Sequence, residues 1–276
     1  MSATGEKPQT QVDRYFDAAS GYWNDIYQSP DVQGLVYRRR MATALRWVRE
    51  LELTDGACAL DIGCGAGLLS VELARLGMSV TGTDSSPEMV RSACANAERN
   101  GLQDRIRVQE ADAHRLPFDA DAFQLVTLLG LLPWLHDAPS AVRELGRVLA
   151  PGGTILVTAD NLRRLNRVVE PRENPLMSPL RPVKRALARS AGERPHSAPS
   201  FRHRAEEVDR MLADAGITVV HRTTIGYGPF TVMGRRILPD GVGRLVDERL
   251  QAASLDHPRL RRVGWHYLAA GVKRVP

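Results

Sequence analysis

A glycine-rich segment at residues 60–67 constrains the fold of this chain more than any other feature. It reads Leu-Asp-Ile-Gly-Cys-Gly-Ala-Gly, so an acid stands near the end of an apolar run and three glycines follow at alternate positions. Glycines permit a tight turn and let a ligand lie directly against main-chain atoms. The pattern predicts a strand, a ligand-binding turn and a helix that begins near Leu68. A turn with a purely structural role is the alternative.

The spacing of these glycines also indicates which kind of ligand the turn binds. In a dinucleotide-binding loop a third glycine stands three positions after the second, because a pyrophosphate must reach the start of the helix. This chain has Leu68 at that position, and Asp61 precedes the first glycine. A carboxylate there suits a ligand with an ammonium or sulfonium group better than one with phosphates.

Two more acids follow strands in the same part of the chain. Residues 78–83 predict a second strand that leads into Asp84, where a carboxylate can accept hydrogen bonds from both hydroxyls of a ribose. Ser86 is a typical N-cap for the next helix. A third strand is expected to end at Asp112, so the three acids should form one constellation. For Asp84 the alternative is an ordinary acid in a turn.

The order and spacing of these motifs resemble the class I S-adenosylmethionine-dependent methyltransferases. The resemblance continues through a fourth strand at residues 121–126 and a helix-to-strand turn at residues 147–154. It implies an α/β fold with a doubly wound, seven-stranded and mostly parallel sheet of the Rossmann-like type. It also implies an N-terminal helical lid at residues 1–52, a methyltransferase domain at residues 53–276, and S-adenosyl-L-methionine as cofactor with S-adenosyl-L-homocysteine as product.

The resemblance further implies which residues bind this cofactor. Asp61 and the three glycines would hold the methionine end, and Asp84 would hold the ribose. Asp112 and the backbone of Ala113 would contact the adenine edge. The expected cofactor-binding residues are Tyr27, Arg38, Asp61, Gly63, Cys64, Gly65, Gly67, Asp84, Ser85, Met89, Asp112, Ala113 and Leu129.

Aromatic residues in the first 40 positions form a second informative region. A Tyr-Phe pair, a tryptophan and the pair Ile26-Tyr27 precede a helix expected at residues 41–51. The pattern is similar to the lid of magnesium-protoporphyrin O-methyltransferases, and Tyr27 matches the tyrosine of that lid. Simple packing of these rings onto the sheet is the alternative.

Three side chains are candidates for catalysis, namely Tyr27, His136 and His203. Many relatives have a histidine or an acid near the position of Pro133 or Trp134, and this chain has neither there. His136, further along the same apolar loop, is a possible substitute or an ordinary surface residue. His266 is expected to be structural. No metal site is predicted, because the chain has only three cysteines, at irregular spacing.

The net charge of +5 is concentrated in a proline-rich stretch at residues 161–204. This insertion follows the fifth strand, where ligand-facing loops of such sheets emerge, so it is either a substrate lid or a solvated loop. A basic lid would favour an acidic group on the substrate. Single-stranded nucleic acid is poorly supported, because Phe201 is the one aromatic residue in the stretch and bases need stacking partners.

These features together predict methyl transfer to a small, largely apolar molecule with an acidic group, at oxygen. The alternatives are a nucleic-acid methyltransferase or binder and a non-catalytic scaffold that binds the cofactor. No apolar run approaches the roughly 20 residues that cross a bilayer, and residues 1–8 lack the apolar core of a signal peptide. A cytoplasmic protein without integral membrane association is therefore expected. Monomer and homodimer both stay open.

Overall fold

The computed structural model describes residues 12, 14–17, 20–170, 174, 200–232 and 235–275. Part of the predicted lid and much of the proline-rich insertion lie outside these residues, and the predicted division of the chain at residue 52 stays a prediction. Among the described residues, none of the helices combines the length and the apolar content that crossing a bilayer requires.

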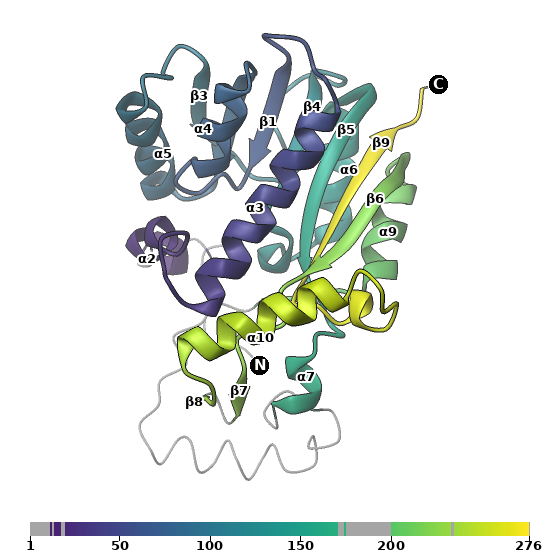
Figure 1. The fold of residues 1–276 in the computed structure, drawn as a ribbon. Coiled ribbons are helices and arrows are strands. Elements are labelled where there is room, and N and C mark those ends of the chain that lie inside the picture. The colour runs from purple at the N-terminus through teal and green to yellow at the C-terminus, as the bar shows by residue number, and fades with distance from the viewer. Residues whose placement is uncertain are drawn as a thin grey trace, which may run out of the picture.

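The centre of the molecule is a seven-stranded sheet (Figure 1). Its strands are β1 (Cys58–Ile62), β2 (Ser79–Asp84), β3 (Ile106–Glu110), β4 (Phe123–Leu128), β5 (Leu149–Asp160), β6 (Ile217–Ile225) and β9 (His266–Lys273). Their order across the sheet is β3-β2-β1-β4-β5-β9-β6. Strand β9 runs antiparallel to both of its neighbours, and the other pairings are parallel. The predicted doubly wound, mostly parallel α/β fold is confirmed.

Helices cover both faces of this sheet. They are α2 (Ser20–Asp25), α3 (Val32–Glu50), α4 (Leu68–Arg75), α5 (Pro87–Arg99), α6 (Ala138–Val148), α7 (Asn166–Val169), α9 (Ala205–Asp214) and α10 (Asp240–Ala253), with short 3-10 turns at Leu132–Trp134 and Leu260–Arg262. In Figure 1, α3 crosses in front of the sheet and α6 lies behind it. Alternate strand residues therefore enter two cores: Leu125 packs with α3 and α4, whereas Val126 packs with α6 and α9.

Local sequence signals explain how the helices near the glycine-rich segment begin. Gly67 has φ +75° at the N-cap of α4, and a Cβ at this position would lie 3.0 Å from the Cβ of Ala93. Ser86 caps α5 as predicted, because its hydroxyl accepts a hydrogen bond from the N–H of Met89 at 3.1 Å. Helices α4 and α5 therefore both begin at the edge of the sheet where β1 and β2 end.

Several predicted boundaries are wrong, including that of the fourth strand, which spans Phe123–Leu128 instead of residues 121–126. Helix α3 begins at Val32 instead of residue 41, because Asp31 caps it by accepting a hydrogen bond from the N–H of Gly34 at 2.8 Å. Strand β3 ends at Glu110 and does not reach Asp112. The expected turn at residues 147–154 is largely the first part of β5, which begins at Leu149.

Candidate active site

A large pocket lies at the carboxyl ends of the parallel strands. Its empty volume is about 1150 Å³, including the part that is open to solvent. The described residues that line it are Val12, Phe16, Trp23, Tyr27, Tyr37, Arg40, Met41, Asp61, Gly63, Cys64, Gly65, Ala66, Leu68, Leu69, Asp84, Ser85, Met89, Leu129, Gly130, Leu131, Pro133, Trp134, Asp160, Trp265 and His266. The polar residues among them fall into two groups.

The first group surrounds the glycine-rich turn. Asp61 is 2% exposed, and its carboxylate accepts hydrogen bonds from Ser70 Oγ at 2.7 Å and Thr127 Oγ1 at 2.8 Å. Burial raises the pKa of Asp61 to about 6, although these two hydroxyls oppose the rise. The carboxyl group is therefore fixed in place and holds its negative charge weakly.

Asp84 ties the end of β2 to the same turn. Its Oδ2 accepts a hydrogen bond from the N–H of Gly65 at 2.9 Å, and its Oδ1 accepts one from the N–H of Ser86 at 3.0 Å. Gly65 has φ +53°, and a Cβ built on it would meet nothing within 4 Å. The turn thus presents bare backbone to the pocket next to a fixed carboxylate.

The second group, which we call the inner cluster, consists of Tyr27, Tyr37, Arg40, Asp160 and His266. Asp160 ends β5 and His266 begins β9, and the antiparallel register places them opposite one another. His266 Nδ1 lies 3.1 Å from Asp160 Oδ1. Arg40 donates a hydrogen bond from Nη2 to the hydroxyl of Tyr27 at 2.9 Å, and its guanidinium lies 4.4 Å from the centre of the Tyr37 ring.

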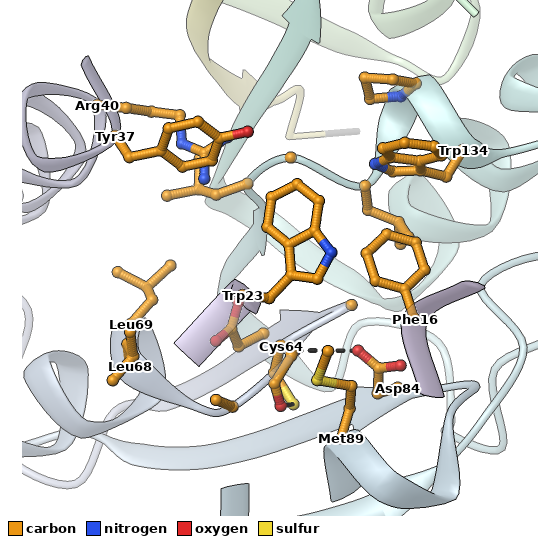
Figure 2. Close-up of a pocket in the computed structure, with 18 of the residues that line it drawn as sticks. Phe16, Trp23, Tyr37, Arg40, Cys64, Leu68, Leu69, Asp84, Met89 and Trp134 are labelled. Carbon is orange, nitrogen blue, oxygen red and sulfur yellow. Dashed lines mark hydrogen bonds between the residues drawn. The ribbon is translucent and has the colours of Figure 1, made fainter. Parts of the chain in front are cut away.

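Aromatic side chains form much of the remaining wall. Figure 2 shows Trp23 in the middle of the view, with Asp84 and Met89 on one side of it and Tyr37 and Arg40 on another. The ring of Trp23 contacts those of Phe16, Tyr37 and Trp134 at centroid distances of 5.6, 6.0 and 6.5 Å. Aromatic rings of this kind bury planar apolar ligands well.

Nine of the residues predicted from sequence line this pocket: Tyr27, Asp61, Gly63, Cys64, Gly65, Asp84, Ser85, Met89 and Leu129. The others lie elsewhere. Gly67 starts α4, and Arg38 donates hydrogen bonds to the carbonyls of Tyr27 and Ser29 at 2.7 and 2.8 Å. Asp112 accepts a hydrogen bond from the N–H of its neighbour His114 at 2.9 Å, and Ala113 is buried in the core behind the sheet.

Both of the predicted catalytic histidines, His136 and His203, also lie outside the pocket lining. His136 is exposed and packs on His114 at a centroid distance of 4.1 Å. His203 lies beside the end of β5, where its backbone N–H donates to the carbonyl of Asp160 at 2.9 Å. Burial lowers the pKa of His203, although Glu207 and Asp160 oppose this effect.

The structure adds pocket residues that the sequence reasoning missed. Asp160 could have been predicted to line the pocket, because it is an acid at the end of an apolar strand, like Asp61 and Asp84. His266, for which the sequence predicts a structural role, also lines the pocket. Its partner could not be read from the sequence, since only the pairing of β5 with β9 brings the two together. Within the described residues, no cluster of histidine, cysteine, aspartate and glutamate is arranged to hold a metal ion.

Comparisons with known proteins agree with this geometry. Residues 60–157 match the family described as a methyltransferase domain. A ubiquinone biosynthesis O-methyltransferase from Xanthomonas campestris is 32% identical over 163 residues, which are 58% of this chain and 65% of that protein. A second from Xanthomonas oryzae is 31% identical over 159 residues, covering 58% and 64%. The alignment therefore spans just under two thirds of the length of these relatives.

Two solved structures share the fold over nearly the whole chain. The magnesium protoporphyrin IX methyltransferase of Synechocystis PCC 6803 with bound SAM is 16% identical, has a TM-score of 0.64, and matches 99% of this chain and 100% of that one. The cyclase SpnF is 21% identical, has a TM-score of 0.63, and matches 96% of each chain. At these identities the likeness concerns the fold.

Proposed function

We propose that this chain, whose residues 60–157 match a methyltransferase domain, is a class I S-adenosylmethionine-dependent methyltransferase that transfers a methyl group to an oxygen atom of a small, largely apolar molecule with an acidic group. One observation supports the proposal above the others. The pocket joins a glycine turn with a fixed carboxylate to an aromatic chamber with its own polar cluster. A pocket built in this way has one end for a cofactor and one for an acceptor.

The residues at the glycine turn fit the cofactor chemically. Asp84 offers carboxylate oxygens to a ribose diol, and Gly65 leaves open space where any side chain would intrude. Asp61 would face the ammonium group of the methionine end. Met89 is 1% exposed and, with Leu129, would contact the adenosine apolarly. These are roles that the geometry supports for the chain's own side chains.

When bound, S-adenosylmethionine supplies a methyl group that is already attached to a good leaving group. The protein must then mainly hold the acceptor oxygen in line with that methyl group and exclude water. Orientation of this sort can contribute about 7–11 kcal/mol to the lowering of a barrier. The aromatic wall around Trp23 and Trp134 would orient the acceptor, and the relatives named as O-methyltransferases support oxygen as the acceptor atom.

A matched pair of glycine variants tests the proposal. The protein is incubated with a mixture of hydroxylated small molecules and a donor labelled in its methyl group, and the products are read by mass spectrometry. We expect a methylated product from the wild type and from Gly56→Ala, and none from Gly65→Ala. Both glycines have positive φ, and an added Cβ would meet no atom within 4 Å at either position. Each alanine substitution should therefore cost about 1 kcal/mol of backbone strain. Only Gly65 lines the pocket.

Two results would count against the proposal. One is the absence of any labelled product with every acceptor in the mixture. The other is equal product from Gly65→Ala and Gly56→Ala, which would show that the glycine turn is not where the donor binds.

Proton release on binding S-adenosylhomocysteine gives a separate test of Asp61. Its folded pKa of about 6 lies above the ordinary value of about 3.9, so its contribution to stability is full at low pH and is lost as the pH rises through 6. A ligand ammonium beside the carboxylate favours ionisation. At pH 6 we expect binding to release roughly half a proton per site, measured as binding heats that differ among buffers with different ionisation enthalpies.

The control for this measurement is pH 7.5, where Asp61 is largely ionised before binding and the release should approach zero. Equal binding heats in all buffers at pH 6 would contradict the assignment of Asp61 to the ammonium group.

A further inference from the structure

We infer that the inner cluster binds the reacting hydroxyl of the acceptor as an oxyanion, so that the acceptor is a phenol or an enol. The inference rests on the proposed function, because the hydroxyl in question is the group that would receive the methyl. Three features carry it: a buried histidine with one nitrogen unpaired, a buried arginine with few acceptors, and flat aromatic walls.

His266 is built to accept a proton. Its side chain is 4% exposed, and Nδ1 is oriented by Asp160 at 3.1 Å. Burial lowers the pKa of His266, although Asp160 opposes the effect, so the ring is neutral near pH 7. With the Nδ1 proton directed at Asp160, Nε2 is the acceptor. Nε2 is buried and has no hydrogen-bond partner among the residues that the structure describes.

Asp160, the partner of His266, has a lowered pKa. Burial would raise the pKa of its carboxyl group, but the hydrogen bond from His266 and the nearby Arg164 and Arg202 lower it overall. Asp160 therefore stays ionised and stabilises His266 when that ring gains a proton. It acts as a positioning residue, because it works through His266.

Arg40 provides the positive charge for an oxyanion. It is 4% exposed, and within the described part of the chain its one hydrogen bond is to the hydroxyl of Tyr27. Its Nε is buried without a partner, and no carboxylate is paired with it there. Gly130 has φ +94°, and a Cβ at that position would lie 2.8 Å from Nη1. The charged guanidinium of Arg40 therefore lies at the pocket wall with N–H groups available to donate to a ligand.

The proton balance selects the acceptor class. The O–H bond of the acceptor breaks, an N–H bond forms at Nε2 of His266, and the electron pair stays on the oxygen beside Arg40. Phenols and imidazoles have ordinary pKa values of about 10 and 6.5. Burial and Arg40 widen this difference by lowering the pKa of His266, whereas the same guanidinium beside the acceptor oxygen narrows it by stabilising the oxyanion. A hydroxyl whose pKa is close to that of bulk water, about 15.7, differs too much from imidazole for this proton transfer. A carboxylate acceptor would have no proton to give.

The aromatic walls agree with a planar ring. Trp265 stacks on His266 at a centroid distance of 4.8 Å and an interplanar angle of 17°. Tyr37 meets the same imidazole edge-on at 5.6 Å and 78°. A flat acceptor can lie along these surfaces with its hydroxyl toward Nε2, whereas a bulky aliphatic ligand would leave them poorly covered.

The test uses 4-nitrophenol, whose absorption spectrum changes when it ionises, with 4-nitroaniline as the matched probe that has no hydroxyl. Protein saturated with S-adenosylhomocysteine is titrated with each probe from pH 5 to pH 8. We expect bound 4-nitrophenol to ionise at a pH at least one unit lower than in solution, which is a tenfold change in the ionised ratio. 4-Nitroaniline should bind more weakly. The charged groups facing the imidazole in this titration are Asp160, Arg40 and Arg164.

Substitutions in the inner cluster test whether it causes the ionisation shift of bound 4-nitrophenol. Arg40→Met should abolish it, and His266→Gln and Asp160→Asn should each reduce it. Arg46→Met is the control, because Arg46 lies on the same helix with its side chain 64% exposed and should behave as wild type. Arg40→Lys, which keeps the charge, should retain part of the shift and covers the case in which Arg40→Met fails to fold.

The outcomes separate the two proposals. If the wild type binds no S-adenosylhomocysteine in calorimetry, the proposed function fails. If it binds S-adenosylhomocysteine, but 4-nitrophenol either does not bind at millimolar concentration or binds without an ionisation shift, the inference about the inner cluster fails alone. A shift that Arg40→Met and His266→Gln leave unchanged would also overturn it.

Discussion

Replacing Asp84 with alanine is expected to weaken the binding of S-adenosylhomocysteine by at least about 100-fold. The carboxylate would accept two hydrogen bonds from the ribose diol, and a hydrogen bond to a charged group contributes about 1.5–3 kcal/mol. Two such bonds lost together amount to about two orders of magnitude or more in affinity. The variant also removes the acceptor for the N–H of Gly65, which loosens the turn on which the cofactor would lie. Isothermal titration calorimetry measures the change.

Asp104→Ala is the matched control for this variant. Asp104 is an exposed acid in the turn before β3, outside the pocket lining, so its loss changes the net charge equally and should leave the affinity within twofold. A thermal melt of each unliganded variant shows whether the fold is retained. If Asp84→Ala folds and binds as tightly as Asp104→Ala, the ribose site is not at β2.

The cofactor end of the pocket could be predicted from sequence because its determinants are local. Three glycines at alternate positions fix a turn of positive φ, and an acid at a strand end lies at the carboxyl edge whatever the rest of the chain does. This is why the positions of Asp61 and Asp84 at strand ends predict that they lie on the pocket wall, while the family resemblance implies Met89 there. Parallel strands bring such ends together without any knowledge of the loops between them.

The predicted constellation of three acids held for only two of them. Asp61 and Asp84 both line the pocket. Asp112 lies two residues beyond the end of β3, where its side chain turns back to accept hydrogen bonds from its own neighbour His114. Asp and Asn commonly bond the backbone two residues on, which ends a strand early. The adenine contact expected of Asp112 stays a prediction.

The acceptor end could not be predicted, because distant strands and a long helix build it. Asp160 and His266 meet through the antiparallel register of β5 and β9. Tyr37 and Arg40 lie on α3, in a stretch that the sequence reasoning placed before a shorter helix. The cap at Asp31 starts that helix at Val32 instead of residue 41 and so presents both side chains to the pocket. Non-local pairing of this kind leaves no periodic signal in the sequence.

Asp247→Ala is expected to destabilise the protein by about 3–5 kcal/mol, which is the usual cost of removing one partner of a buried ion pair. Asp247 is fully buried on α10. Its Oδ2 pairs with Arg39 of α3 at 2.5 Å, and its Oδ1 accepts hydrogen bonds from the N–H groups of Tyr227 and Gly228 at 2.5 and 3.1 Å. Alanine would leave the Arg39 guanidinium with a long hydrogen bond to Gln251 at 3.4 Å and the two buried N–H groups without their acceptor.

The melting temperature should therefore fall by roughly 6–20 °C, at about 2–4 °C per kcal/mol for a chain of this size, and differential scanning calorimetry measures it. Glu248→Ala is the control, because this neighbour on α10 is exposed and its loss should cost no more than about 0.5 kcal/mol. Equal melting temperatures for the two variants would show that Asp247 is dispensable. A large difference would mean that the contact between α10 and α3, the helix that carries Tyr37 and Arg40, contributes to the stability of the fold.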